Sequence, residues 1–292
     1  MQYLLFIITS LIWGGAFFLM KKAGLAFGPL TIGATTTFGG AFVLWISWLV
    51  KQNAWQVRRQ HLIPLSIVCL LGYIFPYAAQ PFLIKLIGHG FIGMMVALVP
   101  IFTILISIPL LSVYPSRKQF LGILVGMVCL SLMVIDGLNR DVSWFYLFMA
   151  LSVPLCYAIS NILVQRSLQD LPPIILVALF MTAATIALIP LSLVFETITI
   201  DDNFVTAIVA ILLLSVFARG IAMLFFYKMI KVNGPLFAGM VTYVIPIEAL
   251  MWSWIDNERI TLMQVSAILI VLLVVGVVQR DIVHRNKKVK NT

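Results

Sequence analysis

The chain contains few charged residues. Only 10% of its 292 residues are Asp, Glu, Lys or Arg, whereas 62% are hydrophobic; a typical soluble domain is about 25% charged. A water-soluble protein of this length could not bury so much apolar surface. A membrane protein need not bury it, because lipid covers the outside. The scarcity of charge therefore indicates an integral membrane protein.

The sequence also lacks several motifs that are typical of metal sites, nucleotide hydrolysis and catalysis. There are only three cysteines and no CxxC pair, which argues against a disulfide framework and against a zinc site. There is no GxxxxGK[ST] phosphate loop, no HExxH, and no paired aspartates or Ser–His couple within the apolar runs, which argues against ATP hydrolysis and intramembrane catalysis. We expect no cofactor and no metal.

What the sequence does contain is a series of long apolar runs. Inside a bilayer each run must satisfy its own backbone polar groups, and helices of about 20 residues do so. The alternating polarity of a β-barrel is absent. We predict an all-α integral membrane protein with ten transmembrane helices. The expected spans are 3–20, 30–50, 62–84, 89–111, 119–136, 144–164, 174–195, 204–228, 234–255 and 262–279.

The basic residues favour one side of the predicted membrane. With ten spans both termini share a side, and 13 of the 19 Lys and Arg residues fall on it, against five on the opposite side. The positive-inside rule then places both termini on the cytoplasmic side of the membrane, although Lys21 and Lys22 alone would favour the reverse. The net charge of +9 is explained by this topology, so we expect no nucleic-acid partner.

The two halves of the chain resemble each other. Residues 13–21 align with 157–165 at a shift of 144, and residues 93–100 match 239–246 at a shift of 146. Five spans in each half is an odd number, so the halves must enter the membrane from opposite sides. Such inverted repeats are common in secondary transporters, with a site near the midplane. The predicted units are two five-helix repeats and a basic cytoplasmic tail: 1–138, 143–280 and 281–292.

The motifs at the start and end of the chain resemble a known family. The opening of an EamA-type repeat of the drug/metabolite transporter superfamily is similar to the pattern formed by Trp13, Gly14, Phe17, Lys21 and Pro29. Its close is similar to the pattern formed by Pro246, Glu258, Arg259, Ile260, Thr261 and Gln264. The resemblance implies two inverted five-helix repeats, a central cavity and export of small metabolites. Thr35–Thr37 replaces an Arg common in the family, so no particular substrate is implied.

Two ionisable residues lie deep in apolar sequence, Arg219 and Glu248. A charge at bilayer depth is costly unless it is paired or hydrated, so such groups usually face the interior of the bundle. Arg219 is a candidate for binding a carboxylate or phosphate, and Glu248 for binding an amine or taking up a proton. The alternative is a structural ion pair between the two.

The other candidates are rings and amides. Pro76 and Pro81 interrupt the span 62–84, which frees backbone carbonyls and marks either a cavity wall or a kink for packing. Tyr77 and Gln80 share a face there. Further rings and one amide suit an organic substrate or, taken singly, core packing: Trp13, Tyr157, Asn161 and Tyr243.

These features together predict a secondary transporter that exports small metabolites such as amino acids by alternating access around a central cavity. Its partners would be a small-molecule substrate and the lipid bilayer, and it would act as a monomer or homodimer. Proton coupling through Glu248 and uniport both fit. The alternatives are a flippase for lipid-linked substrates, a channel, or an intramembrane enzyme.

Overall fold

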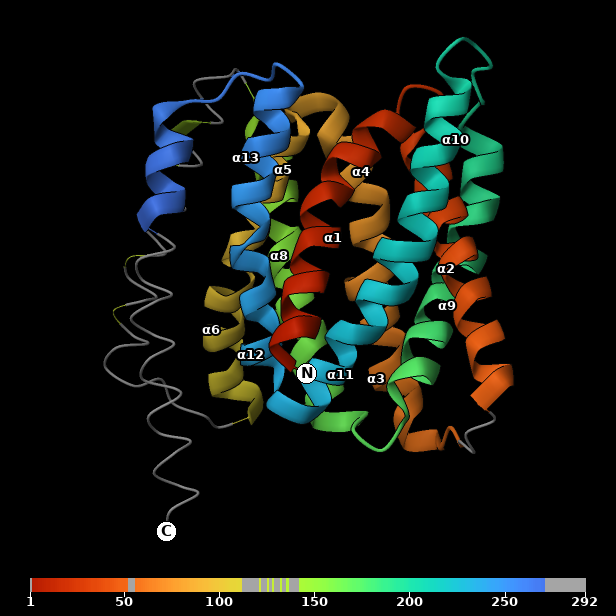
Figure 1. Cartoon of the computed structure of the whole chain (residues 1–292). Coiled ribbons are helices and arrows are strands. Elements are labelled where there is room, and N and C mark those ends of the chain that lie inside the picture. Colours follow the sequence, from red (N-terminus) through yellow and green to blue (C-terminus); the bar gives the residue numbers. More distant parts are fainter. Residues whose placement is uncertain are drawn as a thin grey trace.

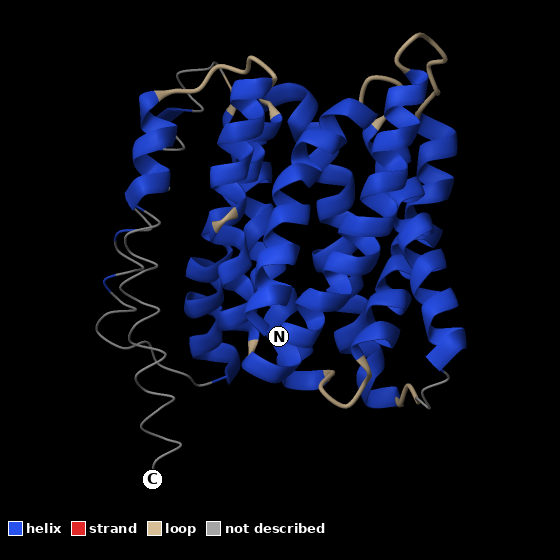
Figure 2. Ribbon diagram, in the orientation of Figure 1, coloured by secondary structure: helices blue, strands red, loops and turns tan. Residues whose placement is uncertain are grey.

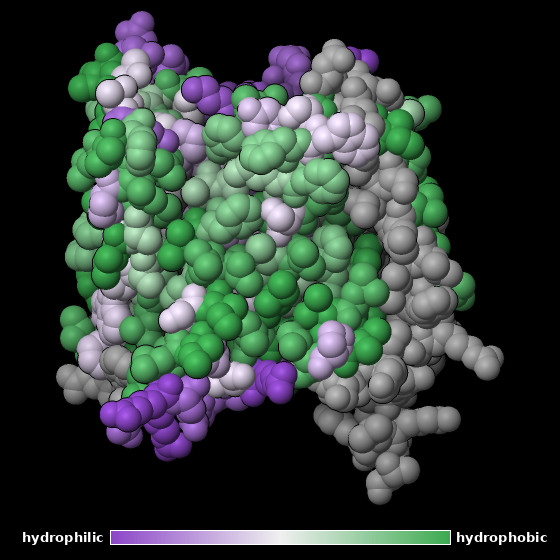
Figure 3. Space-filling view, turned by 180° about the vertical axis from the view of Figure 1, so that it is seen from behind, coloured by the Kyte–Doolittle hydropathy of each residue, from purple (hydrophilic) through white to green (hydrophobic). Residues whose placement is uncertain are grey.

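The computed structural model describes residues 2–51, 56–111 and 142–270, together with six single positions between 121 and 136. Every element in these residues is helical, and no strand occurs among them (Figure 2). Eight of the described helical segments are long and apolar enough to cross a membrane. Figure 3 shows a broad hydrophobic surface with hydrophilic residues gathered at its two ends, as a bilayer requires.

The described residues of the first half form four crossings. The first two are single helices, α1 (Gln2–Ala23) and α2 (Pro29–Lys51). The third combines α3 (Arg59–Cys69), the π-helical segment η1 (Leu70–Ile74) and α4 (Phe75–Ile87). The fourth combines α5 (His89–Met95), the 3-10 segment η2 (Val96–Leu98) and α6 (Val99–Leu111).

The second half repeats this plan. Two single helices, α8 (Trp144–Ser167) and α9 (Pro173–Phe195), come first. The next crossing combines α10 (Phe204–Leu213), the π-helical segment η3 (Leu214–Ala222) and α11 (Met223–Asn233). The fourth described crossing of this half combines α12 (Pro235–Gly239), the 3-10 segment η4 (Met240–Tyr243) and α13 (Ile245–Ile255).

The irregular positions of the two halves coincide. The π-helical segments begin at Leu70 and Leu214, which are 144 residues apart. The hairpins that follow turn at Gly88 and Gly234, whose φ angles of 99° and 84° lie in the region that favours glycine. A 3-10 segment interrupts the fourth crossing in both halves. This structural repetition fits the two-repeat architecture.

The long helices α2 and α9 pack against each other and run in opposite directions (Figure 1). The start of α2 is held by the residue that follows α9, because the Glu196 carboxylate accepts hydrogen bonds from the backbone N–H groups of Leu30 (2.8 Å) and Thr31 (2.7 Å). Midway along the pair, Thr185 donates a hydrogen bond to Thr37 over 3.0 Å. The polar side chains of α2 therefore join the two helices.

The first helix of each half packs against the third and fourth crossings of the other half. α1 contacts α10, η3, α11 and α13, whereas α8 contacts α3, η1, α4 and α6. Glycine also allows close approach between α2 and η3. A Cβ atom added at Gly40 of α2 would lie only 2.8 Å from the Arg219 Cβ atom. The two halves are thus interleaved, and their shared interior is where α1 and α8 meet the π-helical segments.

The expected spans agree with the structure in eight cases, although the crossings 59–87 and 204–233 are longer than the expected spans 62–84 and 204–228. The additional residues lie at the ends of these crossings, at 59–61, 85–87 and 229–233. Pro76 lies at the start of α4 and does not end the crossing. The expected span 119–136 lies almost wholly outside the described residues. Only the start of 262–279 is described, and it is helical over 262–270. The tail 281–292 is also outside them.

Candidate functional site

A partly enclosed cavity lies between the two halves. It is lined by α1, by the third and fourth crossings of both halves, and by α8. The lining residues are Trp13, Ala16, Phe17, Met20, Gly72, Tyr73, Gln80, Val96, Val99, Tyr157, Ser160, Asn161, Arg219, Met223, Phe226, Tyr227, Thr242 and Ile245. Most of them are apolar or aromatic, as in sites for small organic molecules.

The cavity walls are related by the repeat but differ in polarity. Trp13 and Phe17 of α1 correspond to Tyr157 and Asn161 of α8 at the shift of 144, and all four line the cavity. At both places the residue from the second half is the more polar one. Arg219 adds a charge on the same half. The cavity is therefore asymmetric, with a more apolar face from α1 and a more polar face from α8 and Arg219.

Hydrogen bonds across the cavity tie the halves together. The Trp13 indole N–H donates to the Ala218 carbonyl over 3.2 Å, and the Tyr157 hydroxyl donates to the Gln80 side-chain oxygen over 3.2 Å. Ala218 lies within η3, and a π-helical turn weakens the regular hydrogen-bond ladder, so its carbonyl can accept this additional bond. Each bond joins one half to the other, so both positions define the shape of the cavity.

Arg219 is buried in the cavity wall with few partners. Its side chain is only 5% exposed, and its Cζ atom lies 3.6 Å from the centre of the Tyr77 ring. Its Nη2 atom donates a hydrogen bond over 3.8 Å to the Met20 sulfur, which is a weak acceptor. The Nε atom has no partner. Among the described residues, no carboxylate lies within ion-pair distance of this guanidinium.

Tyr77 lies behind Arg219 rather than on the cavity surface. Its side chain is fully buried, its ring contacts the ring of Tyr73 at 5.4 Å between centres, and its hydroxyl has no hydrogen-bond partner. Gln80, three residues later, does line the cavity. Tyr77 and Gln80 share a helical face, but only Gln80 reaches the surface of the cavity. Tyr77 supports the guanidinium, whereas Gln80 contacts the cavity space.

Glu248 lies apart from Arg219. Its side chain is 8% exposed and packs on Gly14, where an added Cβ atom would lie 2.0 Å from Oε2. Arg219 instead contacts Met20, which is about 9 Å farther along α1 and on another side of that helix, by ideal helix geometry. The ion pair considered from the sequence is therefore not formed. The Glu248 Oε1 atom has no partner, and Glu248 is not among the residues that line the cavity.

Tyr243 is the remaining candidate from the sequence. Its backbone belongs to η4, which borders the cavity through Thr242, but its side chain lies outside the described part of the structure. The structure thus brings five of the eight candidate side chains to one cavity: Trp13, Gln80, Tyr157, Asn161 and Arg219.

An ionic cluster, which we define as Lys21, Lys22, His89, Asp256 and Glu258, joins the halves at one end of the bundle. The Lys21 ammonium lies 2.6 Å from Asp256 and 2.7 Å from Glu258, and the Lys22 ammonium lies 2.8 Å from Asp256. Burial alone would raise the pKa of both carboxyl groups. Hydrogen bonds from the lysines outweigh burial, so the pKa of Asp256 and of Glu258 lies below its ordinary value.

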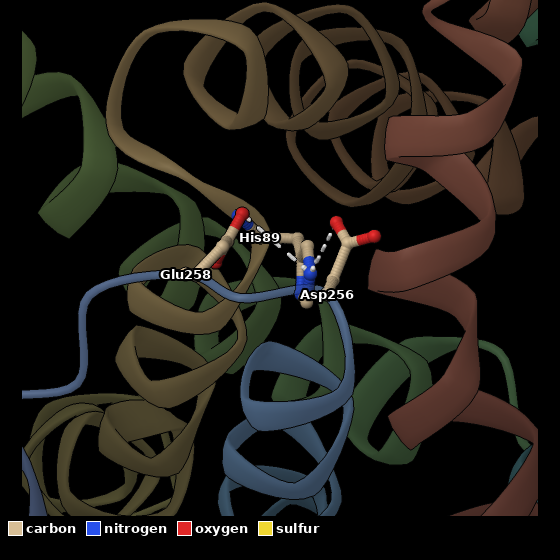
Figure 4. A group of neighbouring side chains, drawn as sticks. All are labelled: His89, Asp256 and Glu258. Atoms are coloured by element: carbon tan, nitrogen blue, oxygen red, sulfur yellow. Dashed lines mark hydrogen bonds and ion pairs between the residues drawn. The ribbon is translucent and has the colours of Figure 1, made fainter.

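His89 is buried within the ionic cluster (Figure 4). Its Nε2 atom lies 3.6 Å from Asp256 and 3.5 Å from Glu258, and neither ring nitrogen makes a hydrogen bond. The ligand atoms of these three residues lie within 4.8 Å of one another, close enough to hold a metal ion. However, Lys21 and Lys22 already neutralise both carboxylates, so the arrangement favours an ionic contact over a cation site.

Sequence reasoning did not identify the ionic cluster. Lys21 and Glu258 belong to two family-like motifs 237 residues apart, Lys21 and Lys22 enter the charge count, and His89 is not among the sequence candidates. The useful signal was that both motifs lie at span ends on the same predicted side of the membrane. Opposite charges at such places can meet when the first and ninth spans pack together, as α1 and α13 do.

The fold and the cavity define a multi-pass α-helical membrane protein built from two similar halves around a shared interior. The chain belongs to the EamA-like transporter family, whose model matches residues 1–135 and 144–279. A solved structure titled only "Crystal structure of protein" is similar, with a TM-score of 0.71 and 17% identity over 95% of this chain and 96% of that chain. This likeness concerns the fold alone. No curated protein matches the chain.

Proposed function

We propose that this chain is a secondary transporter that exports small metabolites, with amino acids among the candidates, by alternating access. One observation carries the proposal: equivalent helices of both halves line one cavity. When two repeats rock against each other around a shared site, the site opens to one side of the membrane and then to the other. Membership of a transporter family supports transport rather than catalysis.

The proposed topology has ten helices in two inverted repeats, 1–138 and 143–280, followed by the basic tail 281–292. The antiparallel packing of α2 and α9 supports inversion, because these helices are equivalent in the two repeats. The side of the bundle that carries the N-terminus also carries described basic residues: Arg58, Arg59, Arg166, Lys228 and Lys231 (Figure 1). The ionic cluster's carboxylates lie at the other end. We therefore propose that the chain lies in a bacterial inner membrane with both termini on the cytoplasmic side.

We further propose that Glu248 carries the coupling proton. It is a buried carboxyl group with one oxygen atom unpartnered, and it packs on Gly14 in the contact between α1 and α13, which belong to different halves. Rocking of the halves would change its surroundings and so favour protonation in one state and release in the other. It is separate from the cavity, so proton and substrate would occupy different sites in a monomer or in each subunit of a homodimer.

Cysteine accessibility tests alternating access directly. In a variant without its three natural cysteines, Ala16→Cys places a thiol on the cavity wall, whereas Ala178→Cys places one in the fully buried core of α9 as a matched control. We expect a membrane-impermeant thiol reagent to modify position 16 from either side in oriented vesicles and to leave position 178 unmodified. Substrate should change the rates at position 16. Labelling of position 16 from one side only would contradict alternating access.

A further inference from the structure

We propose that the cavity selects small organic anions with an apolar body and that Arg219 binds their anionic group. This inference rests on the proposed transport function and narrows its substrates to molecules that carry no ammonium group. It follows from the charges that line the cavity, from the partners of the guanidinium and from the chemistry of the opposite wall.

The charge of the cavity has one sign. Arg219 is the single charged residue among the described residues that line it, and no Asp or Glu is among them. A buried cation without a counterion is destabilising unless a ligand or water compensates it. An anionic ligand would supply the missing partner. The ammonium group of a zwitterion would meet only neutral groups in this lining.

The guanidinium is held in a position that leaves its donors available. Arg219 packs closely against Gly40 of α2, and its Cζ atom lies over the Tyr77 ring, 3.6 Å from the ring centre. Arginine has five N–H donors arranged for bidentate binding of a carboxylate or phosphate. The contact with the Met20 sulfur uses one nitrogen weakly. Arg219 lines the cavity, and its Nε atom has no hydrogen-bond partner.

The rest of the cavity suits the apolar part of the molecule. Trp13 and Phe226 pack with ring centres 4.8 Å apart, and Phe17 and Met223 extend the same apolar lining. Gln80 and Tyr157 bond to each other, so part of the polar lining is already satisfied. An anion with a compact hydrophobic or aromatic body would therefore place its charge at Arg219 and its body against α1 and α11.

A matched ligand series tests this assignment. Binding to the purified full chain in detergent would be measured by calorimetry for 3-phenylpropionate, 3-phenylpropan-1-ol, 3-phenylpropylamine and phenylalanine, which share one ring and chain. We expect the propionate to bind most tightly, by about 10- to 100-fold over the alcohol, the usual worth of a charge-assisted hydrogen bond. Arg219→Met should abolish this preference. Lys228→Met, at an exposed position on α11, should retain it.

Two further measurements keep the outcome decisive. Arg219→Met should unfold at no lower temperature than the unliganded wild type, because it removes a buried charge that lacks a partner. If it does not fold, Arg219→Lys serves instead and should retain a weaker preference for the acid. Equal binding of the acid and the alcohol by the wild type, or tighter binding of the amine or zwitterion, would overturn the proposal. So would wild-type acid affinity in Arg219→Met.

Failure of the transport function would look different. Counterflow in proteoliposomes, with each compound of the series loaded in turn, reports transport independently of affinity. Counterflow of phenylalanine or the alcohol without any preference for the acid would refute only the anion assignment. Absence of counterflow for every compound, together with one-sided labelling of Ala16→Cys, would refute the transporter itself.

Discussion

Replacing Glu258 by glutamine tests whether the ionic cluster holds the two halves together at one end. In the wild type this carboxylate lies 2.7 Å from the Lys21 ammonium and accepts hydrogen bonds from the Gly90 N–H over 3.1 Å and the Ser253 hydroxyl over 3.2 Å. Glutamine keeps the size of the side chain but removes its charge. The variant therefore changes the electrostatics of the cluster with little change in packing.

The expected loss is moderate. Breaking a fully buried ion pair costs about 3–5 kcal/mol, but Lys21 is 35% exposed and keeps Asp256 at 2.6 Å. A charge-assisted hydrogen bond is worth about 1.5–3 kcal/mol, and solvent screening lowers this figure at a half-exposed lysine. We therefore expect Glu258→Gln to reduce the stability by about 1–2 kcal/mol, an estimate that combines these ranges.

Thermal unfolding in detergent measures this effect. Asp202→Asn is the matched control, because Asp202 is an exposed acid in the loop after α9. Lys21→Met and the Lys21→Met, Glu258→Gln double variant complete a double-mutant cycle, which isolates the interaction between the two residues. A Glu258 variant as stable as the control, or a cycle without coupling between positions 21 and 258, would show that the ionic cluster does not join the halves.

The remaining predictions concern pH, coupling, packing and topology. Because the pKa values of Asp256 and Glu258 are lowered in the folded state, their contribution to stability is complete above their ordinary values of about 4. It is lost as the pH falls through the lower folded values, so the unfolding temperature of the wild type should drop more steeply on acidification than that of Glu258→Gln; parallel curves would contradict this. Glu248→Gln should abolish transport driven by a pH gradient while exchange without a gradient continues, since an amide cannot cycle a proton; gradient-driven uptake in this variant would exclude the proposed coupling. Gly14→Ala should destabilise the protein by about 1–3 kcal/mol, because the new methyl group would lie 2.0 Å from a Glu248 oxygen. Gly15→Ala, with only an ordinary 3.6 Å contact, should have little effect; equal thermal stabilities would argue against this tight contact. Finally, a reporter that is active only in the periplasm should stay silent when it is fused to the C-terminus, and strong activity would reverse the proposed orientation.

Much of the fold could be predicted from the sequence because the bilayer imposes a simple rule. Apolar runs of about 20 residues must form helices to satisfy their backbone, and eight expected spans correspond to crossings in the described residues. The similarity of the two halves was also visible in the sequence, since residues 13–21 align with residues 157–165 at a constant shift of 144. The sequence did not predict the π-helical segments around Gly72 and Arg219, because hydropathy does not distinguish one helical hydrogen-bond pattern from another.

The candidate site was predictable only in part. The prolines in the third expected span indicated Gln80, and an amide at a repeat-related place indicated Asn161; both line the cavity. An ionisable residue in an apolar span usually faces the protein interior, and this rule identified Arg219, which also lines the cavity. The same rule also selected Glu248, which is buried at a different contact. Arg219 and Glu248 both follow this rule, but the rule states only that a polar side chain avoids lipid. It does not state which interior surface the side chain reaches.

The sequence by itself thus determined the helical membrane class, the eight crossings found in the described residues and the twofold repetition, because each depends on local hydrophobicity and spacing. The tertiary structure alone decided that Arg219 rests on Tyr77 at the cavity wall, that Glu248 packs on Gly14 beyond it, and that Lys21 meets Asp256 and Glu258 across the halves. These contacts depend on the rotation and close approach of helices distant in the chain. Small residues such as Gly14 and Gly40 set that approach, and their effect appears only when the partner helix is in place.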